Sequence, residues 1–409
     1  MSEKPPKIRN DLIIKETIRQ DGSKYFVIKD PITYAFFKVG EPEYFIISSF
    51  DGHKTISQIV EVFKSKFNLD IDENSVDGFI RQLQELCFLD NDLTCQELLK
   101  KQRTVSWDGK PSFLGKLLFI KLKAVNPGPL FDRLIKHLRF FFTRGFVRVA
   151  IALILLGSLV MLYNGREIGE SLIRLISFQG IIIIYLSMTV VIVFHEFAHG
   201  LTCKFYGGEV RDLGFLLLYF QPAFYCNVSD AWLFGDKYKR LWVSFAGGFI
   251  QFLMGALAVL VWRVTAADTL INQFSIAILS FSGIAALFNF NPLLRYDGYY
   301  MLSDYLEIPN LRQRAGRYWK NRFKQIFLSA ETEIKDLSER EKRIYFYYGI
   351  LSFIYITFVL GYFFLLAAHF FVSRLGGTGF VIFVAIMVFL FRNIIMDTIQ
   401  GTGEFVKTR

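Results

Sequence analysis

Long apolar stretches without charges dominate the chain beyond about residue 144, whereas the preceding residues mix apolar and charged positions. A helix rises about 1.5 Å per residue, so roughly 20 residues cross a hydrocarbon layer about 30 Å thick. Uncharged stretches of suitable length predict six transmembrane helices, at residues 149–165, 175–194, 241–262, 269–294, 344–373 and 375–391. We therefore expect an α-helical polytopic membrane protein.

The first 92 residues have the patterns of a small α+β domain. Three β-type runs, DLIIKETI, KYFVIKD and TYAFFKVG, come first, with turn residues such as Asp21-Gly22 between them. Thr55 and Gln58 then fit a capping box at the start of a helix. Apolar residues recur at helical spacing in two segments, as Ile56, Ile59, Val60, Phe63 and Phe67 and as Val76, Phe79, Ile80, Leu83 and Leu86. A break after Asp90 is expected to end the second helix.

Residues 93–145 connect this domain to the first apolar stretch. Phe113–Leu122 and Leu130–Phe142 combine apolar faces with Lys and Arg. A basic amphipathic segment gains free energy from apolar burial and from anionic headgroups, so a segment lying on the membrane surface is one interpretation. A solvated connector between the domain and the membrane is the other.

The segment EVRDLGFLLLYFQPAFYCNVSD lies between the second and third apolar stretches and is itself apolar. Gly214, Gln221 and Pro222 interrupt it, which favours extended chain at membrane level over a helix. Such backbone is stable in a membrane only where it is paired or lines a cavity. Asn227 and Asp230, at its end, either line a cleft or cap a loop.

Composition and charge agree with a membrane protein. Apolar residues make up 53% of the chain, and the mean hydropathy is +0.34. A net charge of +10 could indicate nucleic-acid binding, but Lys and Arg flank the apolar stretches on alternate sides, as the positive-inside rule describes. Eleven Lys and Arg residues lie from Arg295 to Arg343, which places this segment on the cytoplasmic side. Four predicted spans precede it, so we expect the N-terminus on the cytoplasmic side as well. We expect no nucleic-acid partner.

The termini and cysteines agree with a bacterial cytoplasmic membrane. The first thirty residues lack the compact apolar core of a cleavable signal peptide. The four cysteines form no CxxC pair and no disulfide framework, which suits a reducing compartment.

The second apolar stretch ends in the motif H-E-x-x-H, formed by His195, Glu196 and His199. Positions i and i+4 share one helix face, so both imidazoles can bind one zinc ion while the carboxylate at i+1 acts on water as a general base. Ionisable groups inside a membrane are costly and usually mark function. The alternative is two histidines with ordinary hydrogen bonds near the headgroups.

A catalytic zinc site needs a third protein ligand. Cys203 lies one turn beyond His199, but one helix delivering three ligands would hardly surround an ion, so we expect a small buried apolar residue there. Asp297, in NFNPLLRYDGYY, is the better candidate, because the third and fourth stretches return the chain to the level of the histidines. Taken without the histidines, Asp297-Gly298 fits a turn that closes a transmembrane helix equally well.

HEFAHG, followed about a hundred residues later by N-x-x-P-x-x-x-x-D-G, resembles the site-2 protease family of intramembrane zinc metalloproteases. The resemblance implies that His195, His199 and Asp297 bind one Zn²⁺ ion and that Glu196 is the catalytic base. Tyr296 departs from the leucine usual in the family before the aspartate.

The same resemblance implies substrate contacts. Asn289, the first residue of the second motif, would hold the substrate backbone or its oxyanion, with Pro292 and Gly298 in the same motif. The extended segment that ends near Asn227 resembles the membrane-level β element of the family, whose edge strand holds a substrate in extended form.

The N-terminal runs VIKDPITYAFFKVGEPEYFIISSFDGHKTISQIVEVF and QLQELCFLD resemble the PqqD-like winged-helix domain, which recognises leader peptides of ribosomally made peptides. The resemblance implies strand addition at Tyr34–Val39 and contacts from the helix that begins near Val76. A domain that only docks a partner, or the rest of this chain, is the alternative.

A PqqD-like domain before such a core resembles peptide zinc metalloproteases encoded beside peptide-maturation and export systems. We therefore expect a PqqD-like domain at 1–92, a linker at 93–145, a protease core at 146–310, a basic cytoplasmic segment at 311–343 and two further helices at 344–409. The expected partners are a peptide substrate, the lipid bilayer and an ABC-type exporter. The alternatives are a non-catalytic export or immunity component and a regulatory site-2 protease that cuts a membrane-anchored signalling protein.

Overall fold

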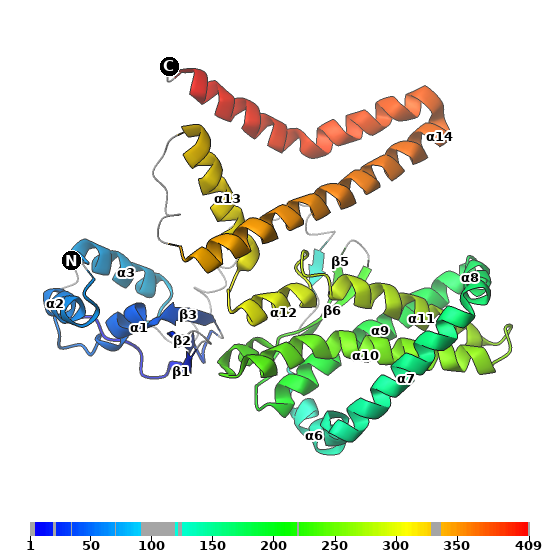
Figure 1. Cartoon of the computed structure of the whole chain (residues 1–409), viewed down its shortest axis with the longest axis horizontal. Helices are drawn as coiled ribbons and strands as arrows, with labels where there is room; N and C mark the ends of the chain where they lie inside the picture. The colour runs from blue at the N-terminus through cyan, green and yellow to red at the C-terminus, as the bar shows by residue number, and fades with distance from the viewer. Residues whose placement is uncertain are drawn as a thin grey trace. The chain divides into compact units, whose positions relative to one another are not determined.

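The structure is a computed structural model that describes residues 5–18, 22–33, 35–69, 71–90, 119–121, 125–218, 221–328 and 337–407. These residues are mostly helical, with two three-stranded antiparallel sheets (Figure 1). The chain divides into two compact units, Met1–Pro309 and Asn310–Arg409.

The N-terminal part of the first unit, here called the head (residues 5–90), contains the predicted sheet. Its strands are β1 (Ile13–Ile18), β2 (Lys24–Lys29) and β3 (Phe36–Gly40), in the order β1-β2-β3. Both pairs are antiparallel, and the register places Ile14 opposite Ile28 and Lys29 opposite Phe36. The sequence prediction of three successive strands is confirmed, although Tyr34 lies outside the described residues.

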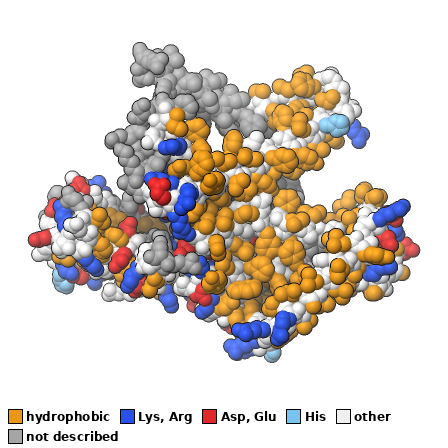
Figure 2. Space-filling view, in the orientation of Figure 1, with side chains coloured by type: hydrophobic (Ala, Val, Ile, Leu, Met, Phe, Trp, Pro, Cys, Tyr) orange, Lys and Arg blue, Asp and Glu red, His pale blue; other side chains and the backbone are white. Residues whose placement is uncertain are grey.

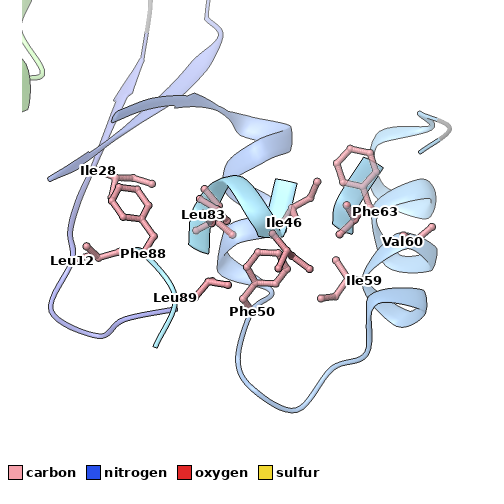
Figure 3. Packing of buried hydrophobic residues seen from close by; sticks show 13 residues of the cluster. Leu12, Ile28, Ile46, Phe50, Ile59, Val60, Phe63, Leu83, Phe88 and Leu89 are labelled. Carbon is pink, nitrogen blue, oxygen red and sulfur yellow. The ribbon is translucent and has the colours of Figure 1, made fainter. Parts of the chain in front are cut away.

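Three helices pack on one face of this sheet: α1 (Glu41–Ser48), α2 (Ile56–Phe67) and α3 (Glu73–Glu85). Ile47 of α1 and Phe63 of α2 form one core with Ile28 of β2 and with Phe50 and Phe88, which follow α1 and α3 in the chain (Figure 3). The capping box that begins α2 is present, because the side chains of Thr55 and Gln58 each accept a hydrogen bond from the backbone N–H of the other.

Two features of the head differ from the sequence prediction. The helix α1 was not predicted, because its eight residues lack a clear apolar period and follow directly from β3. The helix α3 ends at Glu85 rather than after Asp90, since Cys87 takes a left-handed conformation with φ 59°. The chain then returns to the N-terminal segment, where the Arg9 N–H donates to the carbonyl oxygen of Phe88.

Five helices are long and apolar enough to cross a membrane, by length and composition, among the residues that the structure describes. They are α7 (Arg144–Tyr163), α9 (Phe178–Phe205), α10 (Lys237–Val264), α11 (Leu270–Asn289) and the part of α14 at Glu339–Val388. The helix α14 (Glu339–Lys407) contains both of the last two predicted spans, with a kink at Gly376, the second residue of the last predicted span. These helices agree with a polytopic membrane protein.

In the first unit, α10 packs against α7, α9 and α11. Half of the residues in its most apolar stretch are buried, against 11% of those in α7. Gly157 of α7 allows close helix contact, because a Cβ there would overlap Ala256 of α10. The outer surfaces stay apolar: Leu155, Leu159 and Leu287 are exposed, and hydrophobic side chains cover much of the visible surface over these helices (Figure 2).

Shorter helices flank these spans. The helix α8 (Gly165–Arg174), between α7 and α9, was not predicted, because it is too short and polar to look like a span. Within the predicted linker, α6 (Gly128–Leu138) and the 3-10 helix η1 (Arg139–Phe142) form the described part of the second amphipathic segment. Residues 93–118 and 122–124 of that linker lie outside the described part of the chain.

The second sheet confirms the predicted extended chain. Its strands are β5 (Leu213–Leu218) and β6 (Gln221–Cys226), an antiparallel pair, and the unpredicted β4 (Phe119–Lys121), which adds to β5 in the order β4-β5-β6. The 3-10 helix η2 (Ser229–Leu233) follows β6, and α12 (Asp297–Leu306) follows α11.

In the second unit, α13 (Leu311–Leu328) packs against the start of α14. The Trp319 and Phe346 rings stack with their centroids 5.1 Å apart, and Gly349 leaves room for the indole. The basic segment predicted at 311–343 is therefore helical over its first 18 residues.

Candidate metal centre

Three predicted metal ligands converge in the first unit. His195 and His199 lie one turn apart on α9, and Asp297 is the first residue of α12. The Nε2 atoms of the two imidazoles are 3.0 Å apart, and Asp297 Oδ2 lies 3.2 Å from His195 Nε2 and 3.4 Å from His199 Nε2. Both histidines are buried, and Asp297 is partly buried.

These distances fit a zinc ion. Tetrahedral ligands at about 2.0–2.1 Å from Zn²⁺ lie about 3.3 Å from one another, and the three ligand atoms form a triangle with edges of 3.0 to 3.4 Å. Asp297 Oδ2 is also buried without a hydrogen-bond partner among the described residues. A cation between the three atoms would satisfy that oxygen, and two nitrogens with one carboxylate oxygen are a donor set that zinc accepts.

The backbone of α10 orients one imidazole. His199 Nδ1 lies 2.6 Å from the carbonyl oxygen of Val243. A carbonyl only accepts hydrogen bonds, so Nδ1 must carry the proton, which leaves Nε2 free to bind a metal. Val243 therefore fixes the tautomer that the site requires.

Gly247, one turn beyond Val243 on α10, makes room for the site. A Cβ at this position would overlap His199 Nε2 and the His195 ring. Only a glycine allows α10 to lie this close to both imidazoles. The role of Gly247 was not predicted, although a Gly247-Gly248 pair inside an apolar span is a signal of close helix packing.

Glu196 lies beside the ligands and faces a cavity of about 360 Å³. The lining residues come from α9, from the end of β6 and its following loop, and from α10 and α12, and they include Glu196, His199, Cys226, Asn227, Trp232, Arg240, Asp297, Tyr300 and Asp304. The backbone N–H of Cys226 hydrogen bonds to the Glu196 carboxylate. A Cβ at Gly200 would come within 2.9 Å of Cys226 Sγ, so this glycine lets β6 approach α9.

A buried ion pair lies in the same cavity. Arg240 Nε donates to Asp304 Oδ1 at 3.1 Å, and Arg240 Nη1 donates to the carbonyl oxygen of Phe234 at 2.7 Å. Burial raises the pKa of Asp304 above its ordinary value, although the charge of Arg240 acts in the opposite direction. This pair was not predicted, because its members are 64 residues apart in the chain.

The predicted substrate-binding residues fall in different places. Asn227 lines the cavity, but its side chain also holds the loop: its Nδ2 donates to Asp212 Oδ2 at 3.3 Å, and its Oδ1 accepts from the Ser229 N–H. Asn289 ends α11 and donates to Gln251 Oε1 at 3.2 Å. It is not among the residues that line the cavity.

The other motif positions do not line the cavity either. Pro292 is exposed after the end of α11. A Cβ at Gly298 would overlap the carbonyl group of Phe290, so this glycine closes the turn between α11 and α12. Cys203, the alternative third ligand, is fully buried among apolar residues including Phe131 and Val243, and it is absent from the ligand group. The sequence expectation of a small buried residue there is confirmed.

Taken together, the five apolar helices support a membrane protein, and His195, His199 and Asp297 form a group that could hold a metal ion next to the H-E-x-x-H glutamate. The chain is 29% identical over 140 residues to the Bacillus subtilis (strain 168) protein named "Putative peptide zinc metalloprotease protein YydH". The match covers 34% of this chain and 53% of that protein, so the chain spans about half the length of the curated relative. No family model and no solved structure matches the chain. The relative supports a zinc metalloprotease function at the level of the enzyme class.

Proposed function

We propose that the chain is an intramembrane zinc metalloprotease that hydrolyses a peptide bond of a membrane-associated or ribosomally made peptide. The observation that carries the proposal is the triangle of ligand atoms from His195, His199 and Asp297, with Glu196 in the same cavity. The name of the Bacillus subtilis relative supports the same enzyme class. The motif lies on α9, a helix apolar enough to cross a membrane.

His195, His199 and Asp297 would hold one Zn²⁺ ion. When bound, zinc makes water more acidic and polarises a carbonyl group. Glu196 then takes the proton from the attacking water and delivers it to the leaving amine. The Cys226 N–H, which hydrogen bonds to the carboxylate, orients Glu196 for both transfers.

The strand β6 offers a place for an extended substrate. It forms one edge of the described sheet, and its last residue, Cys226, lines the cavity. A peptide added to a sheet edge gains backbone hydrogen bonds and is held out of helical form. Holding the peptide out of helical form matters in a membrane, because the backbone groups of a transmembrane helix are already hydrogen bonded to one another.

Asn289 is proposed to act in this site through its amide, which Gln251 orients. Since Asn289 does not line the cavity in this structure, the proposed contact requires a substrate-bound arrangement in which the amide turns toward the peptide. The head is proposed to recruit the peptide. The protein is placed in the bacterial cytoplasmic membrane with a cytoplasmic head, where an ABC-type exporter could accept the product.

The test is Glu196→Gln in the purified full-length protein loaded with Zn²⁺, using β-casein as an unfolded protein probe. The amide keeps the size of the side chain but cannot act as a base. Zinc content should stay equal to that of the wild-type chain, while hydrolysis falls to background. Glu170→Gln is the matched control, since Glu170 is exposed on α8 and pairs with Arg166.

Retained hydrolysis in Glu196→Gln would remove Glu196 from the mechanism. Hydrolysis by neither protein, despite bound zinc, would favour a non-catalytic export or immunity component. Binding of a synthetic leader peptide to full-length Glu196→Gln would support recruitment by the head, whereas cleavage of a membrane-anchored protein without such binding would favour a regulatory protease.

A further inference from the structure

The head contacts the segment that forms one wall of the cavity. Lys29 Nζ, at the end of β2, lies 2.7 and 2.9 Å from the two carboxylate oxygens of Asp230 in η2. Lys29 is only 3% exposed. A buried ammonium group is costly unless a carboxylate pairs with it, so this ion pair determines where the head and η2 can meet.

An aromatic contact lies beside the ion pair. The register of the head sheet places Phe36 directly across from Lys29, and the Phe36 ring meets the Trp232 ring edge-on with centroids 6.2 Å apart. Two cross-strand neighbours of the head therefore contact Asp230 and Trp232, two residues of the same 3-10 turn. Lys29 Nζ also lies 5.8 Å from the centroid of the Phe36 ring.

The turn that the head holds also forms part of the candidate active site. Ser229, Ala231 and Trp232 of η2 line the cavity together with Glu196. Asp230 does not line it, and one of its oxygens accepts a hydrogen bond from the Glu209 N–H at 3.1 Å. The segment η2 thus links the head to the cavity.

The same face of the head sheet carries Lys38. It lies two residues beyond Phe36 in β3, so both side chains project from this face. Burial raises the pKa of the cavity carboxylate Asp304, and the charge of Arg240 and, to a smaller extent, that of Lys38 act in the opposite direction. Tyr25 and Val27 lie on the same face of the sheet as Lys29 and are buried. This face is therefore covered, as is the opposite face, on which α1, α2 and α3 pack.

Building on the proposed protease function, we propose that Lys29 is a positioning residue of the active-site wall. Its ion pair with Asp230 fixes η2 and the Trp232 ring, so the head shapes the cavity that receives the peptide. Neither Lys29 nor Asp230 lines the cavity, and therefore their loss acts on peptide binding more than on the chemical step.

The first test measures hydrogen exchange of the backbone amides of residues 225–234 in the full-length protein. Lys29→Met removes the charge and keeps the length of the side chain. We expect exchange about tenfold faster than in the wild-type chain, because breaking a buried pair frees the turn. Lys29→Arg, which keeps a cation, should restore slow exchange. The matched control is Lys24→Met in the same strand, since Lys24 pairs with Glu16 at an exposed site.

Asp230→Asn provides a second route, because the amide oxygen can still accept the bond from the Glu209 N–H while the charge is lost. It should speed exchange in the same residues. The double variant should be no faster than Lys29→Met, because Lys29→Met already removes the pair with Asp230 together with the weaker contact of Lys29 Nζ with Glu209 Oε2 at 3.6 Å. Equal exchange in Lys29→Met, Asp230→Asn and Lys24→Met would overturn the proposal.

The second test measures hydrolysis of β-casein by the zinc-loaded chain. Lys29→Met should raise KM about tenfold with kcat within about twofold, and Lys29→Arg should restore KM. A loss confined to kcat, or no rescue by Lys29→Arg, would contradict a positioning role. If the wild-type chain does not hydrolyse casein, the protease function fails, while faster exchange in Lys29→Met still supports the control of η2 by the head.

Discussion

His199 donates its Nδ1 proton to the carbonyl oxygen of Val243, 2.6 Å away, and presents Nε2 to Asp297. The bond joins α9 to α10 at the site where α12 begins. A hydrogen bond to the second ring nitrogen fixes both the tautomer and the orientation of a metal-binding histidine. Three helices thus contribute to one imidazole and its surroundings.

Asp297→Asn should weaken zinc binding by at least about a hundredfold, because the amide replaces the only anionic ligand of the trio. The measurement is zinc affinity by competition with a chelating dye, together with metal content after dialysis. Asp268→Asn, at an exposed position between α10 and α11, should keep the wild-type affinity. Unchanged affinity in Asp297→Asn would exclude the aspartate as a ligand.

Gly247→Ala should disrupt the site without changing any ligand. The added Cβ overlaps His199 Nε2 and the His195 ring, so α10 or the imidazoles must move. We expect zinc affinity to fall about tenfold or more, measured as for Asp297, since small displacements of the groups around a ligand have effects of this size.

Gly255→Ala is the matched control on the same helix. Its Cβ would meet Ser282 Cβ at 3.5 Å, an ordinary van der Waals distance. If both alanine variants bind zinc as the wild-type chain does, the close approach of α10 at Gly247 has no role in the site.

The head should lose stability in acid through Asp30. Its carboxylate is fully buried and accepts two hydrogen bonds from Arg9, at 3.0 and 3.1 Å. Burial alone would raise the pKa of Asp30, but the bonds from Arg9, Thr33 and Ile32 lower it below its ordinary value. The stabilisation is therefore complete above the ordinary aspartate pKa of about 3.9 and is lost as the pH falls through the lower folded value.

This pH dependence can be followed by hydrogen exchange of the β2 amides from pH 7 to pH 2, corrected for the intrinsic effect of pH on exchange. Asp30→Asn should be less stable at pH 7, because it leaves the buried Arg9 without its carboxylate. It should also remove the acid-dependent step. An identical acid transition in Asp30→Asn would assign the step to another group.

Thr55→Ala should destabilise the start of α2 by about 1 kcal/mol, since the hydroxyl accepts the Gln58 N–H in the capping box. Faster exchange of the first amides of α2 is the expected result. Ser57→Ala, an exposed position in the first turn, should have little effect. Equal exchange in both variants would show that the cap does not hold this end of the helix.

The sequence predicted those parts of the fold that local patterns determine. Apolar length located the spans, because a membrane requires about 20 residues in a helix. The spacing of His195 and His199 placed both on one face of α9, as the structure confirms. The interruption at Gly214 and Pro222 predicted extended chain, which the antiparallel pair of β5 and β6 confirms.

Contacts between distant segments were not predictable in the same way. The strand β4 pairs with β5 across more than ninety residues, and nothing in its three residues identifies that partner. The pairing of Lys29 with Asp230 spans 201 residues and depends on burial that a single sequence does not reveal. Val243 contributes through its backbone carbonyl, so its side chain gives no indication of the role.

Two of the three ligands lie on one helix and the third lies about a hundred residues later at the start of another, so an ion bound there would act as a cross-link between segments. An ion that binds the folded chain alone stabilises it in proportion to the logarithm of the free ion concentration. Removing the metal would therefore loosen the start of α12, where Asp297 lies, while the bond from Arg240 still holds Asp304. The mobility of this wall of the cavity would thus depend on the supply of the ion.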